Sequence, residues 1–250
     1  MWGQQIGGSN YGNIINTYMT YIFGGRYNDH DNDVANTFNS IQKWDGINRT
    51  TESETLEEKL VDTSSSRLNA YIYIIGGTGP AGLFGKIQKW DSITRTTESS
   101  VSTAPVNHAS SKLGSYIFSF AGAGTGLIYS WDGTNWVTRS NFGSSRYGLS
   151  ASTLGSYAYI FGGYTSPNFL MTINKYVLDT LTTESATLSI GSQEHSSSTR
   201  GSYAYIFGGY TPTWESLIQK WDGTTRTTES ATLANKLYRH SSATLSWYGL

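Results

Sequence analysis

The chain contains no cysteine. This absence excludes disulfides, thiolate nucleophiles and thiolate metal ligands together. Charged residues are also scarce, at 14% of the sequence against roughly 25% in an average soluble protein, and the formal net charge is -1. Because no block of like charge occurs, the composition does not indicate a nucleic acid or an anionic membrane surface as a partner.

Long apolar runs are missing as well. No stretch approaches the roughly 20 residues that a helix needs to span a bilayer. The first residues, MWGQQIGGSNYG, lack the basic region and apolar run of a signal peptide. We therefore expect a soluble chain without membrane insertion and without a cleaved leader, and the composition leaves its localisation open.

Five units of one design account for most of the chain. The stretch GSYAYIFGGYT occurs at residues 155–165 and again unchanged at residues 201–211, and weaker copies begin at Met19, Tyr71 and Tyr116. An IQKWD-like block and then a TTES-like block follow. Corresponding positions lie 41 to 52 residues apart, a period typical of propeller blades or helical arrays. The units are rich in Tyr, Ile, Phe, Trp and Thr and show no 3.6-residue apolar period, which favours β-blades.

The first strand of each unit is apolar on both faces. Tyr157, Tyr159 and Phe161 point to one face, whereas Ala158 and Ile160 point to the other. Such a strand suits a position between two neighbouring sheets. The paired glycines that end these strands predict a sharp turn with positive φ and a close approach to the adjacent blade. They stand at positions 24 and 25, 76 and 77, 162 and 163, and 208 and 209.

A large aromatic residue recurs at one position of the second strand and predicts packing between blades. The five copies are Trp44, Trp90, Trp131, Tyr176 and Trp221. A strand ending in Gly-Gly and followed 12 or 13 positions later by an aromatic residue resembles the kelch motif of β-propellers. The third unit departs from this motif with AGAG in place of Gly-Gly, and the fourth with Tyr176 in place of Trp.

The kelch resemblance implies four-stranded blades with an additional innermost strand. Its copies span residues 64–68, 108–113, 149–154, 195–200 and 240–245. Because no further unit follows the last copy, we expect residues 240–245 to pair into the first blade and close the ring. We thus predict an all-β, single-domain, five-bladed kelch-like β-propeller over residues 1–250. The predicted blades span residues 17–58 plus 240–245, 62–104, 107–142, 148–190 and 194–235.

Three histidines share one position at the start of the innermost strand, namely His108, His195 and His240. Equal positions in a ring of blades place these side chains at equal height near the central channel, where they could converge on a ligand or a metal. The alternative, which the repetition favours, is a structural histidine bound to neighbouring groups. Thr63 and Leu149 take the position in two other units. We predict neither a metal nor a cofactor.

Kelch-like propellers present two sets of loops on one face, and the resemblance implies that this face binds partners. The loops after the first strand of each unit span residues 26–40, 78–86, 122–126, 164–172 and 210–217. Aromatic and arginine side chains that differ between matched units are the candidate contact residues. They are Arg146, Tyr147, Tyr164, Tyr210, Trp214, Tyr238 and Arg239.

The motifs that would mark an enzyme are absent or incomplete. No Gly-x-Ser-x-Gly elbow occurs, and SWDGTNW departs from the aspartate box of sialidases at Thr134. Our hypothesis is a non-enzymatic binding or structural module that holds a protein partner or a glycan. The richness in Ser, Thr, Gly and Asn is similar to phage and viral surface proteins, which favours attachment within a virion, a cell surface or another assembly. The alternative is a sugar-modifying enzyme of the kelch-like epimerase or sialidase type, whose Arg, Glu or His side chains would meet in a deep pocket.

Overall fold

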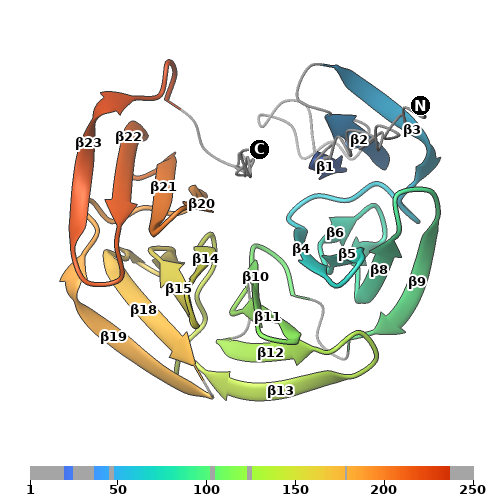
Figure 1. The fold of residues 1–250 in the computed structure, drawn as a ribbon, viewed down its shortest axis with the longest axis horizontal. Coiled ribbons are helices and arrows are strands. Elements are labelled where there is room, and N and C mark those ends of the chain that lie inside the picture. Colours follow the sequence, from blue (N-terminus) through green and yellow to red (C-terminus); the bar gives the residue numbers. More distant parts are fainter. Residues whose placement is uncertain are drawn as a thin grey trace, which may run out of the picture.

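Five β-sheets lie round a common centre as the blades of a β-propeller (Figure 1). The structure is a computed structural model, and it describes residues 20–24, 37–44, 48–101, 105–122, 126–177 and 179–236. None of these residues forms a helix, so no membrane-spanning helix is found among them. The predicted all-β, five-bladed propeller is confirmed.

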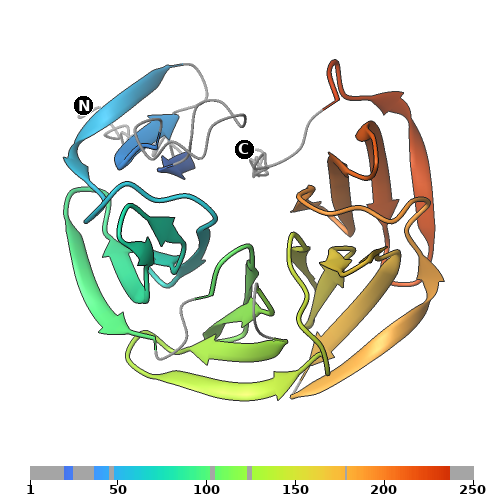
Figure 2. The same ribbon diagram turned by 180° about the vertical axis from the view of Figure 1, so that it is seen from behind.

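Each blade is an antiparallel sheet whose strands run in chain order from the centre outward (Figures 1 and 2). Blade 1 contains β1 (Thr20–Phe23), β2 (Ser40–Trp44) and β3 (Arg49–Thr55). Blade 2 contains β4 (Ser64–Leu68), β5 (Tyr71–Ile75), β8 (Lys86–Trp90) and β9 (Arg95–Ser100). Blade 3 contains β10 (Ala109–Leu113), β11 (Tyr116–Phe120), β12 (Leu127–Trp131) and β13 (Trp136–Asn141). Blade 4 contains β14 (Ser150–Leu154), β15 (Tyr157–Phe161), β18 (Thr172–Val177) and β19 (Thr180–Thr187). Blade 5 contains β20 (Ser196–Arg200), β21 (Tyr203–Tyr210), β22 (Trp214–Trp221) and β23 (Arg226–Thr232).

The closing strand expected at residues 240–245 lies outside the described residues, so the closure of the ring stays a prediction. Within the part of blade 1 that the structure describes, β1 pairs only with β2. The four other blades each have an innermost strand before the strand that matches β1. The edge of β1 that faces the centre is therefore where the predicted strand would pair.

Aromatic side chains hold neighbouring blades together. Trp90, Trp131, Tyr176 and Trp221 are at most 1% exposed. Each lies edge-on to a ring from the preceding blade, at a distance at which such pairs stabilise beyond their burial alone. The ring centroids are 5.7 Å apart in Trp90–Tyr21, 5.9 Å in Trp131–Tyr73, 5.0 Å in Tyr176–Phe118 and 5.6 Å in Trp221–Tyr159. The predicted packing between blades is confirmed for these four residues.

The paired glycines allow the next blade to approach the backbone closely. Gly162 has a φ of +49°, and a Cβ added there would lie 2.7 Å from the backbone oxygen of Ser192. The N–H of Gly163 donates to that same oxygen at 2.8 Å. Blade 3 keeps this turn without the first glycine, since Ala121 takes its place with a φ of 55°. At position 121 the departure therefore changes the residue and keeps the positive φ.

Hydroxyl groups connect the innermost strands of neighbouring blades. Their oxygens are 3.0 Å apart in Ser66–Ser110, 2.6 Å in Ser111–Thr153 and 2.9 Å in Ser152–Ser197. On the outermost strands, the repeated TTES glutamates pair with the lysine of the IQKWD-like block. These pairs are Lys43–Glu52, Lys89–Glu98, Lys175–Glu184 and Lys220–Glu229. Both sets of contacts repeat from blade to blade, so they belong to the architecture and not to a site.

Candidate functional site on the loop face

Two sets of loops meet on one face of the propeller. One set consists of the connections between blades. The other consists of the loops after the second strand of a blade, which is the first strand of each sequence unit. Backbone bridges join the two sets. The bridged pairs are Val61 with Thr78, Gly122 with Arg146, Tyr147 with Tyr164, and Gln193 with Tyr210. The two sets of loops therefore meet in blades 2 to 5.

Two of these loops contain a small hairpin of their own. In blade 4, β16 (Tyr164–Thr165) pairs with β17 (Asn168–Phe169), and in blade 2, β6 (Thr78–Gly79) pairs with β7 (Gly82–Leu83). The two hairpins share one strand register, and each is followed by the same hydrogen bond back to the glycine pair. Its length is 2.9 Å from Phe84 N to Gly77 O in blade 2 and 2.8 Å from Leu170 N to Gly163 O in blade 4.

Four aromatic side chains form a continuous row across blades 4 and 5. The ring centroids are 5.3 Å apart in Tyr147–Tyr164, 5.0 Å in Tyr164–Phe169 and 5.8 Å in Phe169–Tyr210. All four side chains are half-buried. We call Tyr147, Tyr164, Phe169 and Tyr210 the aromatic row.

Tyr147, Tyr164 and Tyr210 were predicted from the sequence as contact residues, whereas Phe169 was not. Aligning YTSPNF in blade 4 with TGPAGL in blade 2 would have placed Phe169 opposite Leu83 and exposed the difference. Partial burial raises the pKa of the Tyr147 phenol, and the neighbouring Tyr164 and Glu194 raise it further. The phenol is thus neutral at physiological pH and can donate a hydrogen bond.

Arg146, next to Tyr147 in the chain, is buried and does not lie on the surface. It is 4% exposed, its Nε donates to Gly162 O at 2.7 Å, and its Nη1 donates to Asn174 Oδ1 at 2.6 Å. The guanidinium also lies over the ring of Phe142. Burial lowers the pKa of Arg146 to about 10, so the group stays protonated at neutral pH. These contacts fix the connection that carries Tyr147, and the burial removes Arg146 itself from the candidate contact surface.

The two described histidines are enclosed between blades. His108 is 7% exposed, and its Nε2 lies 2.6 Å from Ser64 Oγ in blade 2. Burial lowers the pKa of His108 to about 3, so the ring is neutral. His195 is 5% exposed and lies against Gly162 and Gly209. We therefore place neither histidine in the contact surface, and the described residues contain no cluster of His, Asp and Glu that could hold a metal ion.

Of the four remaining candidate contact residues, only Trp214 belongs to a described strand. Trp214 begins β22, where its backbone pairs with Tyr210 at one end of the row. Tyr238, Arg239 and His240 lie outside the described residues.

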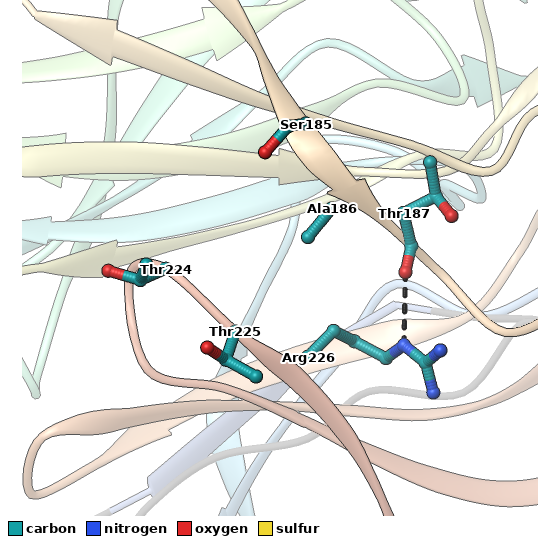
Figure 3. A pocket seen from close by; sticks show the side chains of 6 residues that line it. All are labelled: Ser185, Ala186, Thr187, Thr224, Thr225 and Arg226. Atoms are coloured by element: carbon teal, nitrogen blue, oxygen red, sulfur yellow. Dashed lines mark hydrogen bonds between the residues drawn. The ribbon is translucent and has the colours of Figure 1, made fainter.

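An open hollow of about 400 Å³ lies at the outer edge, between β19 and the turn from β22 to β23 (Figure 3). Small hydroxyl side chains and Arg226 line it, and the lining includes neither a glutamate nor a histidine. It therefore lacks the acid–base pair that a sugar-modifying enzyme would need.

Comparisons with known proteins support the propeller fold and do not identify a family or a function. No known protein family matches the chain, and no curated protein does so. Among solved structures, one titled "Structure of YjhT" superposes with a TM-score of 0.70 at 12% sequence identity. The match covers 85% of this chain and 81% of that chain. At this identity the likeness shows the propeller fold alone, and the resemblance to the kelch family stays a prediction.

Proposed function

We propose that the protein is a non-enzymatic binding module that holds a protein partner or a glycan with the aromatic row. One observation carries the proposal: the blade 4 hairpin has aromatic side chains where the same hairpin in blade 2 has none. Tyr164 and Phe169 correspond to Thr78 and Leu83. Because the hairpin forms in both blades, the rings are not needed to build it.

The chemistry of the row suits recognition. Tyrosine offers a large, rigid contact area with a polar tip and loses little side-chain entropy on binding, and it is enriched among the residues that dominate binding energy. The rings of the row pack on one another across two blades, and the buried Arg146 fixes the backbone connection that carries Tyr147. Such a preorganised apolar surface fits the face of a sugar ring or an apolar side chain of a protein.

We further propose that this binding serves attachment within a larger assembly, such as a virion or a cell surface. The support is compositional. Ser, Thr, Gly and Asn are abundant and charge is sparse, as in the phage and viral surface proteins to which the sequence bears a similarity. A half-buried aromatic row on a propeller face is also the kind of surface that a partner covers.

The test compares matched hairpins. Tyr164→Ala and Phe169→Ala remove the row, whereas Leu83→Ala changes the corresponding hairpin of blade 2. We expect wild type and Leu83→Ala to retain a ligand on a glycan array or in a pull-down from the native source, and the two row variants to lose it. If neither assay detects a partner and the protein instead turns over a sugar, the binding module is wrong and the sugar-modifying enzyme takes its place.

A further inference from the structure

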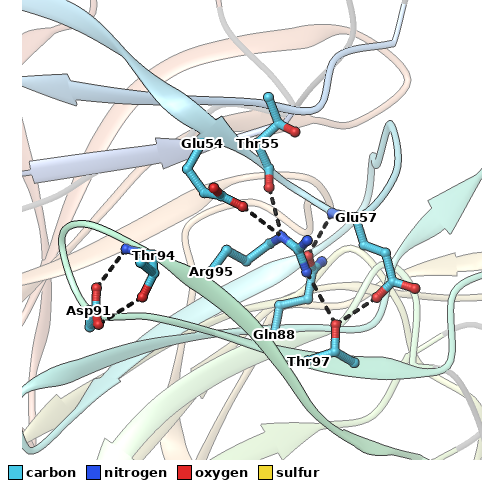
Figure 4. A network of polar contacts seen from close by, with 8 residues as sticks. All are labelled: Glu54, Thr55, Glu57, Gln88, Asp91, Thr94, Arg95 and Thr97. Atoms are coloured by element: carbon cyan, nitrogen blue, oxygen red, sulfur yellow. Dashed lines mark hydrogen bonds and ion pairs between the residues drawn. The ribbon is translucent and has the colours of Figure 1, made fainter.

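The interfaces between blades 1 and 2 and between blades 4 and 5 are built alike at their outer edge. In the first, Arg95 Nε donates to Thr55 O at 2.7 Å (Figure 4). In the second, Arg226 Nε donates to Thr187 O at 3.0 Å (Figure 3). The turn before each arginine is also the same.

An aspartate holds that turn in both places. Asp91 Oδ1 accepts from the N–H of Thr94 at 2.7 Å, and Asp222 Oδ1 accepts from the N–H of Thr225 at 2.7 Å. Each arginine also binds a threonine hydroxyl two residues further along its strand. The Nη1–Oγ1 distances are 3.2 Å for Arg95 with Thr97 and 2.9 Å for Arg226 with Thr228.

The two interfaces differ in their carboxylates. Glu54 Oε1 lies 3.8 Å from Arg95 Nε, and the carboxylate of Glu57 accepts a bond from Thr97. The register of the repeats puts Ala186 where Glu54 stands and Ser189 where Glu57 stands. The hollow of about 400 Å³ beside Arg226 is the space next to Ala186 (Figure 3).

The carboxylates of the turn, of β19 and of β23 already have partners. Asp222 accepts the two N–H groups of its own turn, at 2.8 and 2.7 Å. Glu184 and Glu229 pair with Lys175 and Lys220. A guanidinium has five N–H donors, and Arg226 uses one on Thr187 and one on Thr228. No ion pair of Arg226 is found among the described residues.

We propose that this hollow receives the carboxylate of an acidic side chain from a protein partner. The partner's carboxylate would take the place that Glu54 occupies at the matched interface, where the molecule itself shows a glutamate beside an equivalent arginine. Arginine and carboxylate pair with two parallel hydrogen bonds where the geometry allows. Ser185, Thr224 and Thr225 line the same space.

The experiment is an NMR titration of the arginine Nε–H signals at constant ionic strength. The probes are N-acetyl-glutamate amide, its neutral glutamine counterpart, and glucuronate as a sugar carboxylate. We expect the glutamate probe to shift the signal of Arg226 saturably, with a half-point in the millimolar range. The signal of Arg95 should stay in place, because Glu54 already occupies the matched position.

Two variants test the proposed carboxylate site, one by adding a glutamate beside Arg226 and the other by removing the glutamate beside Arg95. Ala186→Glu supplies the missing carboxylate and should weaken the response of Arg226 about tenfold or more. Glu54→Ala opens the matched interface and should make Arg95 respond, which keeps the test valid if Ala186→Glu folds poorly. Equal shifts of both arginines in wild type, an equal effect of the glutamine probe, or a stronger effect of glucuronate would each overturn the proposal. The site is separate from the aromatic row, so its failure would leave the proposed function standing.

Discussion

Aromatic side chains serve two different regions of this propeller. Between blades, Trp90, Trp131, Tyr176 and Trp221 are at most 1% exposed and recur at one position of successive units. On the loop face, the rings of the aromatic row are half-buried and belong only to blades 4 and 5. Aromatic residues between blades are thus part of the repeat, whereas those of the aromatic row depart from it.

The comparison separates what the fold requires from what it permits. A residue that each blade needs must recur, because each blade packs on its neighbour in the same way. A residue that only one or two blades carry is free to serve another purpose, provided that the strands pair in the same way without it. The hairpins of blades 2 and 4 meet that condition, since Thr78 pairs with Leu83 as Tyr164 pairs with Phe169.

The largest effect should come from the interfaces between blades. Trp90→Ala and Tyr176→Ala each remove a fully buried ring, and we expect each to lower the free energy of unfolding by about 3 to 5 kcal/mol. Ile93→Ala is the control, since Ile93 is 77% exposed and its loss should change stability by no more than about 0.5 kcal/mol. Urea denaturation measures all three. Losses no greater than that of Ile93→Ala would show that these rings do not hold the blades together.

The next effect concerns the backbone contact between blades 4 and 5. Gly162 and Gly155 both have positive φ, but only at Gly162 would a Cβ meet the next blade, 2.7 Å from Ser192 O. At Gly155 nothing lies within 4 Å. We expect Gly155→Ala to cost about 1 kcal/mol from conformational strain and Gly162→Ala to cost about 2 kcal/mol or more. Thermal and urea unfolding of the pair would decide, and equal costs would contradict the close approach.

A smaller effect should follow pH through His108. Burial lowers the pKa of His108 from 6.5 to about 3, so between these values the unfolded chain binds a proton that the folded chain does not. The contribution of the neutral ring is complete above about pH 6.5 and is lost as pH falls towards 3. We expect the wild type to lose about 1 to 2 kcal/mol more than His108→Gln between pH 7 and pH 5. Parallel stability curves for the two proteins over this range would refute the low pKa.

Much of the architecture could be predicted from the sequence because the same sequence unit occurs five times. Gly-Gly, the aromatic position and the innermost strand each recur, so one exception does not hide the pattern. Ala121 illustrates this, since it replaces a glycine and keeps the positive φ of the turn. Residues that occur once offered no such check, and the candidate site was predicted only in part.

Arg146 shows why the candidate site was predicted only in part. An arginine that is absent from the matching position of other units can be either buried or a contact residue, and the sequence does not distinguish the two. The difference lies in Gly162 and Asn174, which lie 16 and 28 positions along the chain and accept its hydrogen bonds. Phe169 was missed for the opposite reason. Its hairpin partner Tyr164 was visible as an exception, but strands of two residues carry too little periodicity to reveal a hairpin.

The smallest effect on stability should come from exchanging side chains between the two matched hairpins. Thr78→Tyr with Leu83→Phe would give blade 2 the aromatic pair of blade 4, and Tyr164→Thr with Phe169→Leu would do the reverse. Because both hairpins share one strand register and the row is half-buried, we expect each double variant to change the free energy of unfolding by less than about 1 kcal/mol. Urea unfolding measures this difference. A loss from the blade 4 exchange as large as that from Trp90→Ala would mean that the row is a structural element of the same kind as the buried rings, and its role in recognition would have to be given up.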